Sequence, residues 1–476
     1  LHHDHATLPR IYEQRILQTL NHLIPPLQAL PLEALLKDRN YFFSVLETGW
    51  EIYIRQKENG DEGNANWFFD VKLFDDYDVR AKISQIFQNS ELEPIPSELV
   101  LTHRDAWYHI GLVQRESLVG EKSIKLIELI KNIMDETPKL YYQEWFQIAR
   151  LWANLKYLIT KHGQSKINDL ESLNNKIEGL FHDWIMKRFD TLLTLPPKPP
   201  KIVHQIPDYL YRHLTSSNPT KIALIVLDGL AYWQWKIIEN KLIEQESNFS
   251  FSEYAVFAWI PTITSISRQA IFSGKSPIFF EDSIMTTSKE ENLWKSYWIE
   301  HGIEDIQVQY FSKAEEKNIL VNLEERNKIC GLIINSIDEI MHGMTLGEIG
   351  MFNQVEQWCS NGFLLNLLTG LLDRKYEVFL TSDHGNKEVT KRIIVQEGMM
   401  ATTRGERVRF YKDEVLIPEV ENTFIWKSSG LPEYPLYMLA NEGYCFKQSK
   451  GTSIVHGGAS FQEALVPFIK VGYQNE

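Results

Sequence analysis

The sequence predicts an α/β domain with a central, mostly parallel sheet flanked by helices, preceded by a mainly helical N-terminal region. After residue 207, short runs rich in Ile, Val and Leu at 222–227, 331–337 and 377–382 alternate with helix-like stretches. This alternation is typical of α/β domains, whose strands are apolar because helices cover both faces of the sheet. Before residue 193, apolar residues have the spacing of amphipathic helices instead.

The helical spacing is clearest between residues 143 and 159. Its apolar side chains recur every three or four residues, at Trp145, Ile148, Ala149, Trp152, Leu155 and Ile159. This spacing places them on one face of a helix. The segments 8–24, 122–136 and 168–189 have a similar pattern. We therefore expect residues 1–192 to form a mainly helical region that docks partners.

A proline-rich stretch at 193–207 separates this region from the rest of the chain. Four prolines fall within five residues, at Pro196, Pro197, Pro199 and Pro200. Proline lacks the amide hydrogen that a helix or a central strand needs, so the stretch indicates a stiff, extended linker. The expected organisation is a helical region at 1–192, a linker at 193–207 and an α/β domain at 208–476.

Composition limits the class of protein. The apolar content of 43% and the charged content of 24% are typical of folded, soluble proteins. No run approaches the roughly 20 apolar residues of a membrane-spanning helix, so no membrane association is expected. There is no signal-peptide pattern at the start. Because the sequence begins with Leu1 rather than methionine, we expect it to be a fragment or to lack its start.

Charge and cysteine content narrow the setting further. The formal net charge of −14 disfavours a protein that coats nucleic acid non-specifically, although a local basic groove stays open. The three cysteines, Cys330, Cys359 and Cys445, are far apart and form no CxxC pair. This pattern favours a reducing, cytoplasmic location.

Seven side chains with oxygen or nitrogen donors are the main functional signal. They are Asp228, Thr264, Asp338, His342, Asp383, His384 and His456. Each aspartate lies at the end of one of the apolar runs, and functional groups in open α/β sheets gather beyond the carboxyl ends of the strands. We therefore expect the three carboxylates to converge at one edge. Such a donor set suits two adjacent divalent metals with a hydroxyl nucleophile, which predicts phosphoryl or sulfuryl transfer.

Taken one at a time, these motifs also have ordinary structural explanations. Asp228 followed by Gly229 after a strand is most often a turn. Asp338 and His342 are four residues apart, so they share one face of a helix and can chelate one ion. An exposed Asp–His pair at this spacing is also common. His456, which two glycines follow, is by itself more often a loop histidine.

Thr264 is the candidate nucleophile. Pro261 and Thr262 indicate the start of a helix and Gly274 its end, so Thr264 lies in the first turn. There, free amides and the helix dipole favour an anion. A hydroxyl bound to a metal can ionise near neutral pH, as a nucleophile requires. The alternative is an ordinary threonine, with Thr262 competing as the cap. One turn on, Arg268 can contact a phosphate oxygen or pair with an acid.

The order of these motifs resembles the alkaline phosphatase superfamily and, within it, the PglZ domain. The resemblance covers roughly residues 206–476 and is carried by LIVLDGL, PTITSISRQAIFSGKSP, SIDEIMHG, TSDHGN and HGGASFQEALVPF. Two of these segments have the patterns P-x-x-T-x-x-x-R…F-x-G-x-x-P and HGG-x-S-x-QE-x-x-VP. Both patterns favour PglZ over other branches of the superfamily.

The resemblance implies roles for individual residues. One metal would be held by Asp228, Thr264, Asp383 and His384. The other would be held by Asp338, His342 and His456. The usual metal of the superfamily is zinc, which suits these nitrogen and oxygen ligands, with manganese as the alternative. Thr264 would attack phosphorus, and water would release the phosphothreonine with net retention. Arg268 and Asn386 would contact further oxygens of the substrate.

The segment between His384 and His456 is specific to this branch of the superfamily. It contains TRGERVRFYK, in which Arg407, Arg409 and Tyr411 alternate and would share one face of a strand. The arginines either form a basic wall that receives an extended phosphodiester or belong to a solvated face balanced by nearby acidic residues.

PglZ domains occur in BREX bacteriophage-defence systems and in PorX-type response regulators. No receiver-like block precedes the linker, so we favour the BREX-like interpretation. It implies a cytoplasmic protein that works beside a methyltransferase and ATPases. We predict a two-metal phosphodiesterase or nuclease with a threonine nucleophile, acting on nucleotides or nucleic acid. The alternatives are a phosphomonoesterase or phosphotransferase, and a metal-stabilised structural subunit.

Overall fold

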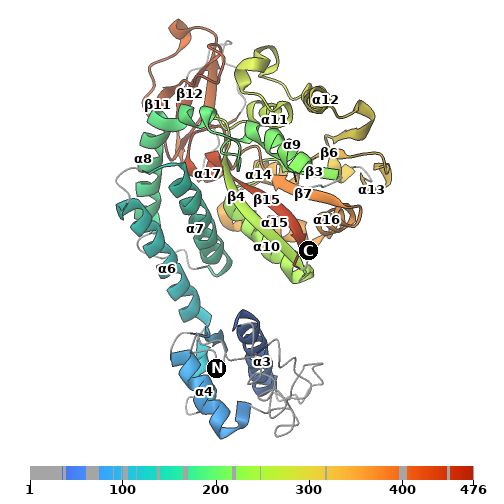
Figure 1. Ribbon diagram of the computed structural model, residues 1–476. Coiled ribbons are helices and arrows are strands. Elements are labelled where there is room, and N and C mark those ends of the chain that lie inside the picture. Colours follow the sequence, from blue (N-terminus) through green and yellow to red (C-terminus); the bar gives the residue numbers. More distant parts are fainter. Residues whose placement is uncertain are drawn as a thin grey trace. The chain divides into compact units, whose positions relative to one another are not determined.

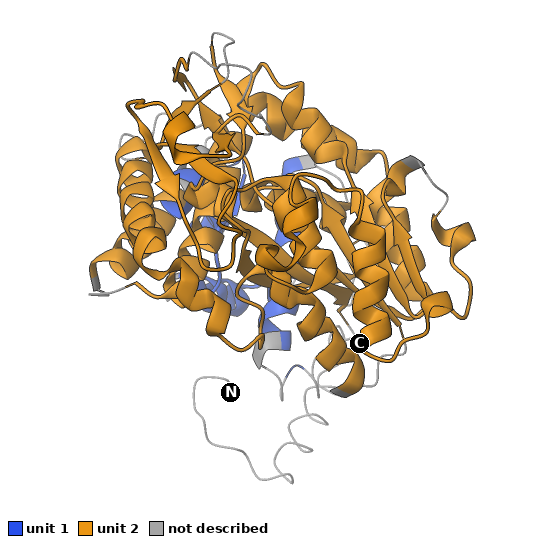
Figure 2. Ribbon diagram, turned by 90° about the horizontal axis from the view of Figure 1, so that it is seen from above, with its two compact units in different colours: residues 1–122 blue, residues 123–476 orange. Residues whose placement is uncertain are grey.

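The structure is a computed structural model. It describes residues 35, 39–59, 74–88, 91–97, 99, 106–113, 115–136, 140–163, 170–216, 221–246, 248–316, 319–395, 405–446 and 451–474. The chain forms two compact units, 1–122 and 123–476, which Figure 2 shows in different colours. The helix expected at 8–24 lies outside the described residues. Within the described residues, no helix is long and apolar enough to cross a membrane.

In the described residues of the first unit, the helices α3 (Arg39–Asn59) and α4 (Tyr77–Gln88) surround an aromatic core. Further elements of the unit are the paired strands β1 (Ile95–Pro96) and β2 (Leu112–Val113), and the 3-10 helix η3 (Trp107–Gly111). Trp50 lies at the centre of the core and contacts the rings of Phe74, Phe87 and Trp107. A side chain at Gly111 would collide with Trp50 and Phe87, so glycine permits this packing.

Three long helices follow, as the sequence pattern predicts. They are α6 (Arg115–Glu136), which begins in the first unit, α7 (Tyr142–Lys161) and α8 (Leu170–Arg188). The predicted apolar face of α7 is buried along its whole length, at Trp145, Ile148, Ala149, Trp152, Leu155 and Ile159. The mainly helical character of this region is therefore confirmed.

The proline-rich stretch at 193–207 lies inside the second unit, and the chain divides near residue 122 instead. Aromatic contacts explain this difference from the predicted division. Phe181 and Trp184 of α8 stack on Phe257 of the sheet, with ring centroids 6.3 and 5.2 Å apart. Large rings that bury one another hold α8 against the sheet. The prolines therefore connect two parts of one core, through η4 (Phe189–Thr194) and η5 (Val203–Gln205).

A six-stranded sheet forms the centre of the second unit (Figure 1), in the order β4-β15-β7-β3-β6-β5. The strands are β3 (Lys221–Leu227), β4 (Phe249–Phe257), β5 (Val308–Phe311), β6 (Ile329–Ile334), β7 (Tyr376–Thr381) and β15 (Leu465–Tyr473). Of these six strands, only β15 runs antiparallel to its neighbours. The predicted mostly parallel sheet is therefore confirmed. The three predicted apolar runs became β3, β6 and β7, which lie side by side.

Two groups of helices pack around this sheet. The first group is α7, α10 (Tyr232–Gln245) and α15 (Gly347–Ser360). The second is α9 (Ile206–Ser216), α11 (Thr264–Ser273) and α12 (Glu290–Glu300). Shorter helices complete the domain: α13 (Ile319–Asn322), α14 (Ser336–His342), α16 (Phe363–Asp373) and α17 (Phe461–Ala464). The start of α14 ends β6 three residues before the predicted strand end at 337.

The segment between β7 and β15 adds a small antiparallel sheet, ordered β10-β12-β11. Its strands are β10 (Val408–Tyr411), β11 (Thr423–Trp426) and β12 (Leu436–Ala440). Two ladders tie the segment together: β8 (Lys387–Val389) with β14 (Ser453–Val455), and β9 (Lys391–Arg392) with β13 (Tyr444–Cys445). Phe410 packs into the main core, whereas Tyr411 packs into a second, smaller cluster. Both faces of β10 are therefore covered.

Candidate metal centre and active site

The seven predicted donors lie together at the carboxyl ends of the parallel strands. Asp228 directly follows β3, and Asp383 and His384 follow β7 after one residue. The helix α14, which begins after β6, supplies Asp338 and His342. Thr264 is the first residue of α11, and His456 follows β14. Strands that end at one edge of the sheet therefore bring together residues that lie up to 228 positions apart in the sequence.

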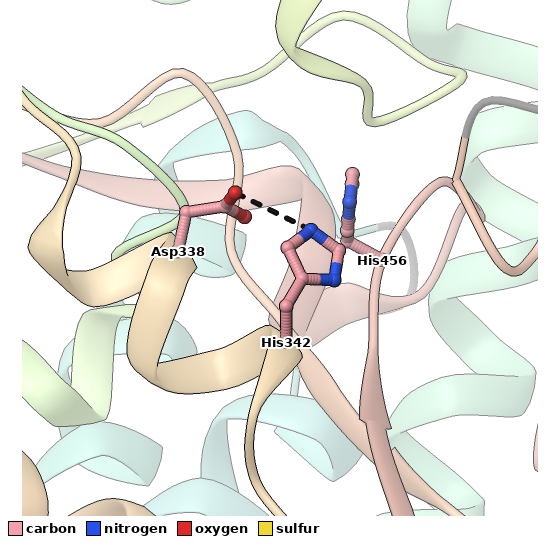
Figure 3. Close-up of side chains that lie close together, drawn as sticks. All are labelled: Asp338, His342 and His456. Atoms are coloured by element: carbon pink, nitrogen blue, oxygen red, sulfur yellow. Dashed lines mark ion pairs between the residues drawn. The ribbon is translucent and has the colours of Figure 1, made fainter.

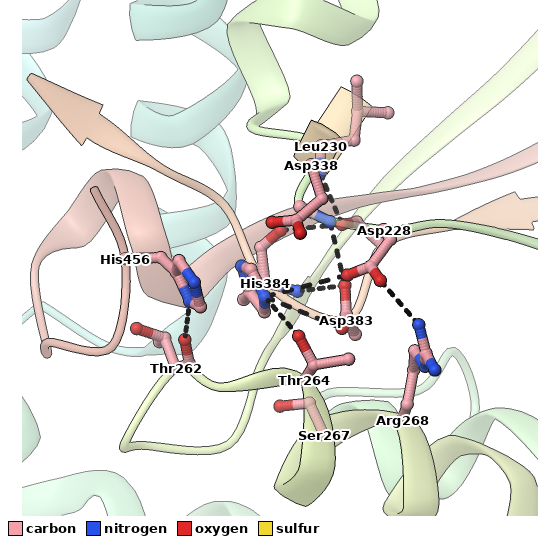
Figure 4. A network of polar contacts seen from close by, with 12 residues as sticks. Asp228, Leu230, Thr262, Thr264, Ser267, Arg268, Asp338, Asp383, His384 and His456 are labelled. Atoms are coloured by element: carbon pink, nitrogen blue, oxygen red, sulfur yellow. Dashed lines mark hydrogen bonds and ion pairs between the residues drawn. The ribbon is translucent and has the colours of Figure 1, made fainter. Parts of the chain in front are cut away.

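One part of the cluster surrounds the Nε2 atom of His384 (Figure 4). This nitrogen lies 3.1 Å from Oγ1 of Thr264, 3.9 Å from Oδ1 of Asp228 and 3.7 Å from Oδ2 of Asp383. The two carboxylates and the imidazole are buried, whereas Thr264 is half-buried. These four residues are the set that the resemblance to the PglZ domain implied for one metal.

The other part of the cluster contains Asp338, His342 and His456 (Figure 3), whose donor atoms lie within 4.8 Å of one another. His342 Nε2 is 3.3 Å from Oδ2 of Asp338. Asp338 also forms a group within 4.8 Å with Asp228 and His384, so the two parts adjoin. The rings of His384 and His456 stack at 4.2 Å.

The two buried histidines, His384 and His456, both point Nε2 toward the cluster and Nδ1 toward a backbone carbonyl oxygen. Nδ1 of His384 lies 3.0 Å from the carbonyl oxygen of Gly385, and Nδ1 of His456 lies 3.0 Å from that of Thr262. A carbonyl oxygen only accepts hydrogen bonds, so each Nδ1 carries the hydrogen and each Nε2 keeps a lone pair. Metal-binding histidines have this arrangement, in which the second nitrogen is held by an oxygen acceptor.

Three carboxylate oxygens in the cluster are shielded from solvent and have no hydrogen-bond partner among the described residues. They are Oδ1 of Asp228, Oδ1 of Asp338 and Oδ2 of Asp383. Burial and the neighbouring Asp383 raise the pKa of Asp228 well above its ordinary value. Buried carboxylate oxygens without a hydrogen-bond partner are costly, and a divalent cation offsets that cost. The residues therefore fit Zn²⁺ or Mn²⁺ at these positions.

Thr262 does not cap α11. The residue before the helix is Ile263, and the Oγ1 of Thr262 donates to the carbonyl oxygen of Gly458 at 2.9 Å. The same Oγ1 accepts from the amide of Gly457 at 3.1 Å. Together with the contact to His456, these bonds hold the loop after β14 against the start of α11. Thr262 thus positions one histidine of the cluster.

Arg268 pairs with acids rather than extending toward a substrate. Its Nη1 donates to Oδ2 of Asp228 at 2.5 Å, and its guanidinium donates to both oxygens of Glu290 at 2.9 and 3.1 Å. Burial lowers the pKa of Arg268, but the charges of Asp228 and Glu290 raise it by more. The net result is a pKa above the ordinary value for arginine. Of the two readings of Arg268 from the sequence, the structure shows the ion pair, which anchors Asp228.

Asn386 makes hydrogen bonds within the fold. Its Nδ2 donates to the carbonyl oxygen of Gly229 at 2.7 Å and to Gln234 at 3.0 Å, and its Oδ1 accepts from Gln234 at 2.9 Å. At 2% exposure it is buried. That Asn386 contacts the substrate stays a prediction. The side chain holds the turn that carries Asp228.

The prediction of a basic wall at Arg407 and Arg409 is wrong. The two side chains are 1% and 7% exposed, so they form neither a wall for substrate nor a solvated face. Arg407 forms an ion pair with Glu463 and donates to backbone carbonyl oxygens. Arg409 lies over the ring of Phe446, 4.5 Å from its centroid. The alternation of Arg407, Arg409 and Tyr411 in the sequence could not show that other segments cover both faces of β10.

Sequence reasoning missed Glu406, which lies beside the cluster. Its Oε1 is 3.4 Å from Nδ1 of His342. Burial raises the pKa of Glu406, but the imidazoles of His342 and His456 lower it to about 2. The residue belongs to none of the motifs that carried the resemblance. Its only local signal is its place directly before Arg407.

Divalent metal should stabilise the second unit, and Asp383→Asn should remove much of that effect. Each ion bound at one hundred times its Kd adds about 2.7 kcal/mol to the free energy of unfolding. The variant should be the more stable protein in chelator, because it relieves the crowding of Asp228, Asp338 and Asp383. Thermal unfolding with zinc and with chelator measures both effects. The exposed Asp305→Asn is the matched control, and equal zinc stabilisation of both variants would contradict the metal site.

The fold and the cluster define a class: phosphoesterase-type hydrolases of the alkaline phosphatase superfamily, which use divalent metals. The family described as BREX system PglZ alkaline phosphatase-like domain matches residues 208–471. The match covers more than half of the chain, so the chain belongs to the PglZ family. The resemblance inferred from the sequence motifs is therefore confirmed. A comparison with curated proteins returned no match.

Solved structures provide distant matches. Murine ectonucleotide pyrophosphatase/phosphodiesterase 5 is 14% identical, with a TM-score of 0.37, over 52% of this chain and 87% of the other. Phosphonoacetate hydrolase from Sinorhizobium meliloti 1021, in complex with phosphonoformate, is 13% identical, with a TM-score of 0.37, over 53% of this chain and 90% of the other. Because both TM-scores are below 0.5, neither match bears on the substrate of this chain.

Proposed function

We propose that this protein is a two-metal phosphodiesterase of nuclease type that uses Thr264 as its nucleophile. One observation carries the proposal: the Thr264 hydroxyl lies in the first turn of α11, 3.1 Å from Nε2 of His384. His384 in turn belongs to a cluster with three carboxylates and two further imidazoles. This is the environment that a hydroxyl needs in order to attack phosphorus.

The side chains around Thr264 have separate tasks in the proposed reaction. The oxygen of Thr264 gives up its proton to solvent and forms a bond to phosphorus, while the bond to one alcohol of the diester breaks and that alcohol leaves with a proton. Water then cleaves the bond between Thr264 and phosphorus and releases the remaining phosphate monoester. Two displacements give net retention at phosphorus. The positive end of the α11 dipole favours the charge that develops beside Thr264. Arg268 keeps Asp228 in place, and Thr262 keeps His456 in place. When bound, divalent metals lower the pKa of the hydroxyl and offset charge on the phosphoryl oxygens.

The charges near Thr264 favour a diester over a monoester. A terminal phosphate carries two negative charges, whereas a diester carries one, so a monoesterase benefits from a further free cation. In the part of the chain that the structure describes, the arginines that contact this cluster, Arg268 and Arg407, are both paired with acids. The diester therefore suits the site better, and we propose a nucleotide or nucleic acid as its source.

The cellular setting follows from the family. We propose that the chain is the PglZ component of a BREX-like defence system in the cytoplasm, beside a methyltransferase and ATPases. The helical region at 1–192 would dock such partners, and residues 208–476 would carry catalysis. The three cysteines support a reducing compartment, because all of them are buried free thiols.

Turnover of two aryl esters tests the proposal. With zinc or manganese added, we expect bis-p-nitrophenyl phosphate to be hydrolysed with a kcat/KM at least about tenfold above that of p-nitrophenyl phosphate, a difference of about 1.4 kcal/mol. Protein stripped of metal by chelator is the control and should be inactive. Preference for the monoester would favour the phosphomonoesterase alternative. If neither ester is hydrolysed by protein shown to hold two metals, the result would favour a structural subunit.

A further inference from the structure

Glu406 adds a carboxylate to the second metal position. Its Oε1 lies 3.4 Å from Nδ1 of His342, and its Oε2 lies 4.0 Å from Nε2 of His456. Only 17% of its side chain is exposed. The residue comes from the segment between β7 and β15, apart from the motifs that supply the seven donors. The part of the chain that is specific to this branch of the superfamily therefore reaches the metal cluster.

Close backbone contacts bring Glu406 to this place. Its carbonyl oxygen accepts from the amide of Phe446 at 2.8 Å, and the amide of the next residue donates to the carbonyl of His456 at 3.1 Å. Gly405 has a φ of +86°, and a Cβ on it would lie 3.4 Å from the Cα of Gly457. Glycine at position 405 allows both the positive φ and the close approach of the two backbone segments, around Gly405 and around Gly457. Backbone hydrogen bonds to Phe446 and to His456 thus place the Glu406 carboxylate beside the cluster.

The two ring nitrogens of His342 face different acids. Nε2 faces Oδ2 of Asp338 at 3.3 Å, on the side of the candidate metal ligands. Nδ1 faces Glu406, in the place where the other two histidines have backbone carbonyl oxygens. An ionised carboxylate accepts a stronger hydrogen bond than a carbonyl oxygen does. Such a partner orients the imidazole and makes it a better metal ligand.

His342 needs such a partner more than the other two histidines do. Its side chain is 45% exposed, whereas His384 and His456 are 0% and 6% exposed. Packing therefore restrains the two buried rings more than it restrains the ring of His342. Fixing a mobile side chain costs conformational entropy, which a hydrogen bond to Nδ1 offsets before any ion binds.

We propose that Glu406 is a positioning residue for the second metal ion: it accepts the hydrogen of His342 Nδ1 and so directs Nε2 toward the ion. This inference rests on the two-metal site of the proposed function. It adds an outer carboxylate that the seven donor positions do not include. Metal affinity tests it independently of hydrolysis.

The test is a zinc titration of metal-free wild type and Glu406→Gln, in competition with a chromogenic chelator. We expect the affinity for the second ion to fall about 10- to 100-fold, with the affinity for the first ion unchanged. The variant His342→Ala identifies the second ion, because it should lose that ion altogether. The free energy of unfolding in chelator is measured alongside, because a loss of stability with both zinc affinities unchanged would mean that the role of Glu406 is merely structural.

Glu414→Gln is the matched control, because Glu414 lies in the same segment with 68% of its side chain exposed. It should bind both ions as wild type does. Unchanged affinity in Glu406→Gln would overturn the role of Glu406, as would an equal loss at both ions. A wild-type stoichiometry below two ions would overturn the two-metal site itself, and this inference with it.

Discussion

Thr264→Ala is expected to lower kcat for diester hydrolysis by at least about 10³-fold, because it removes the atom that attacks phosphorus. Thr264 Oγ1 is 3.1 Å from His384 Nε2, at the start of α11. Initial rates on bis-p-nitrophenyl phosphate, with metal at saturation, measure the loss.

Two further measurements separate the loss of a nucleophile from the loss of the site. Metal content should change little in Thr264→Ala, because Asp228, Asp383 and His384 remain. Thr264→Ser should keep a substantial part of the activity, since it retains the hydroxyl. With bis-p-nitrophenyl phosphate as the substrate, a p-nitrophenyl phosphoryl group linked to the serine should then be trapped on rapid acid quench. Wild-type activity in Thr264→Ala would remove the proposed mechanism while leaving the fold and the family unchanged.

Glu463→Gln is expected to lower the free energy of unfolding of the second unit by about 3–5 kcal/mol, because it leaves a buried charge uncompensated. Glu463 and its partner Arg407 are 0% and 1% exposed. Glu442 lies 3.9 Å from Arg407 and is 35% exposed, so it compensates only part of the charge. Denaturant titration followed by tryptophan fluorescence measures the change.

The same substitution should also disturb the metal cluster. Glu463 accepts from the amide of Gly458 at 2.9 Å and from that of Ser460 at 3.1 Å, and so holds the loop that carries His456. The matched control is Glu325→Gln, where the carboxylate is 96% exposed and pairs with Lys221 at 2.9 Å. That exposed pair should contribute less than about 1 kcal/mol. Equal stability losses in the two variants would show that the buried pair is not important.

Local sequence patterns were sufficient for the fold class and for the place of the donors. The apolar runs at 222–227 and 377–382 became β3 and β7, because strands covered on both faces leave this signature. Each run is followed closely by an aspartate, and the ends of parallel strands share one edge. The site was therefore predictable from residues that are neighbours in the sequence.

The partners of the charged side chains were decided only by the tertiary structure. Arg407 and Glu463 are 56 residues apart, and Asn386 and Gly229 are 157 apart. An arginine in an alternating strand has the same local pattern whether it faces water, a substrate or a buried acid. The choice depends on which distant segment covers it.

The sequence by itself therefore determined the sheet, the helical region before it and the set of candidate ligands, since these depend on periodicity and on strand ends. The tertiary structure decided the position of the unit boundary, the roles of Arg268, Asn386 and Arg407, and the approach of Glu406 to His342. Those features depend on contacts between distant segments, where burial forces each polar group to find a partner that no local pattern specifies.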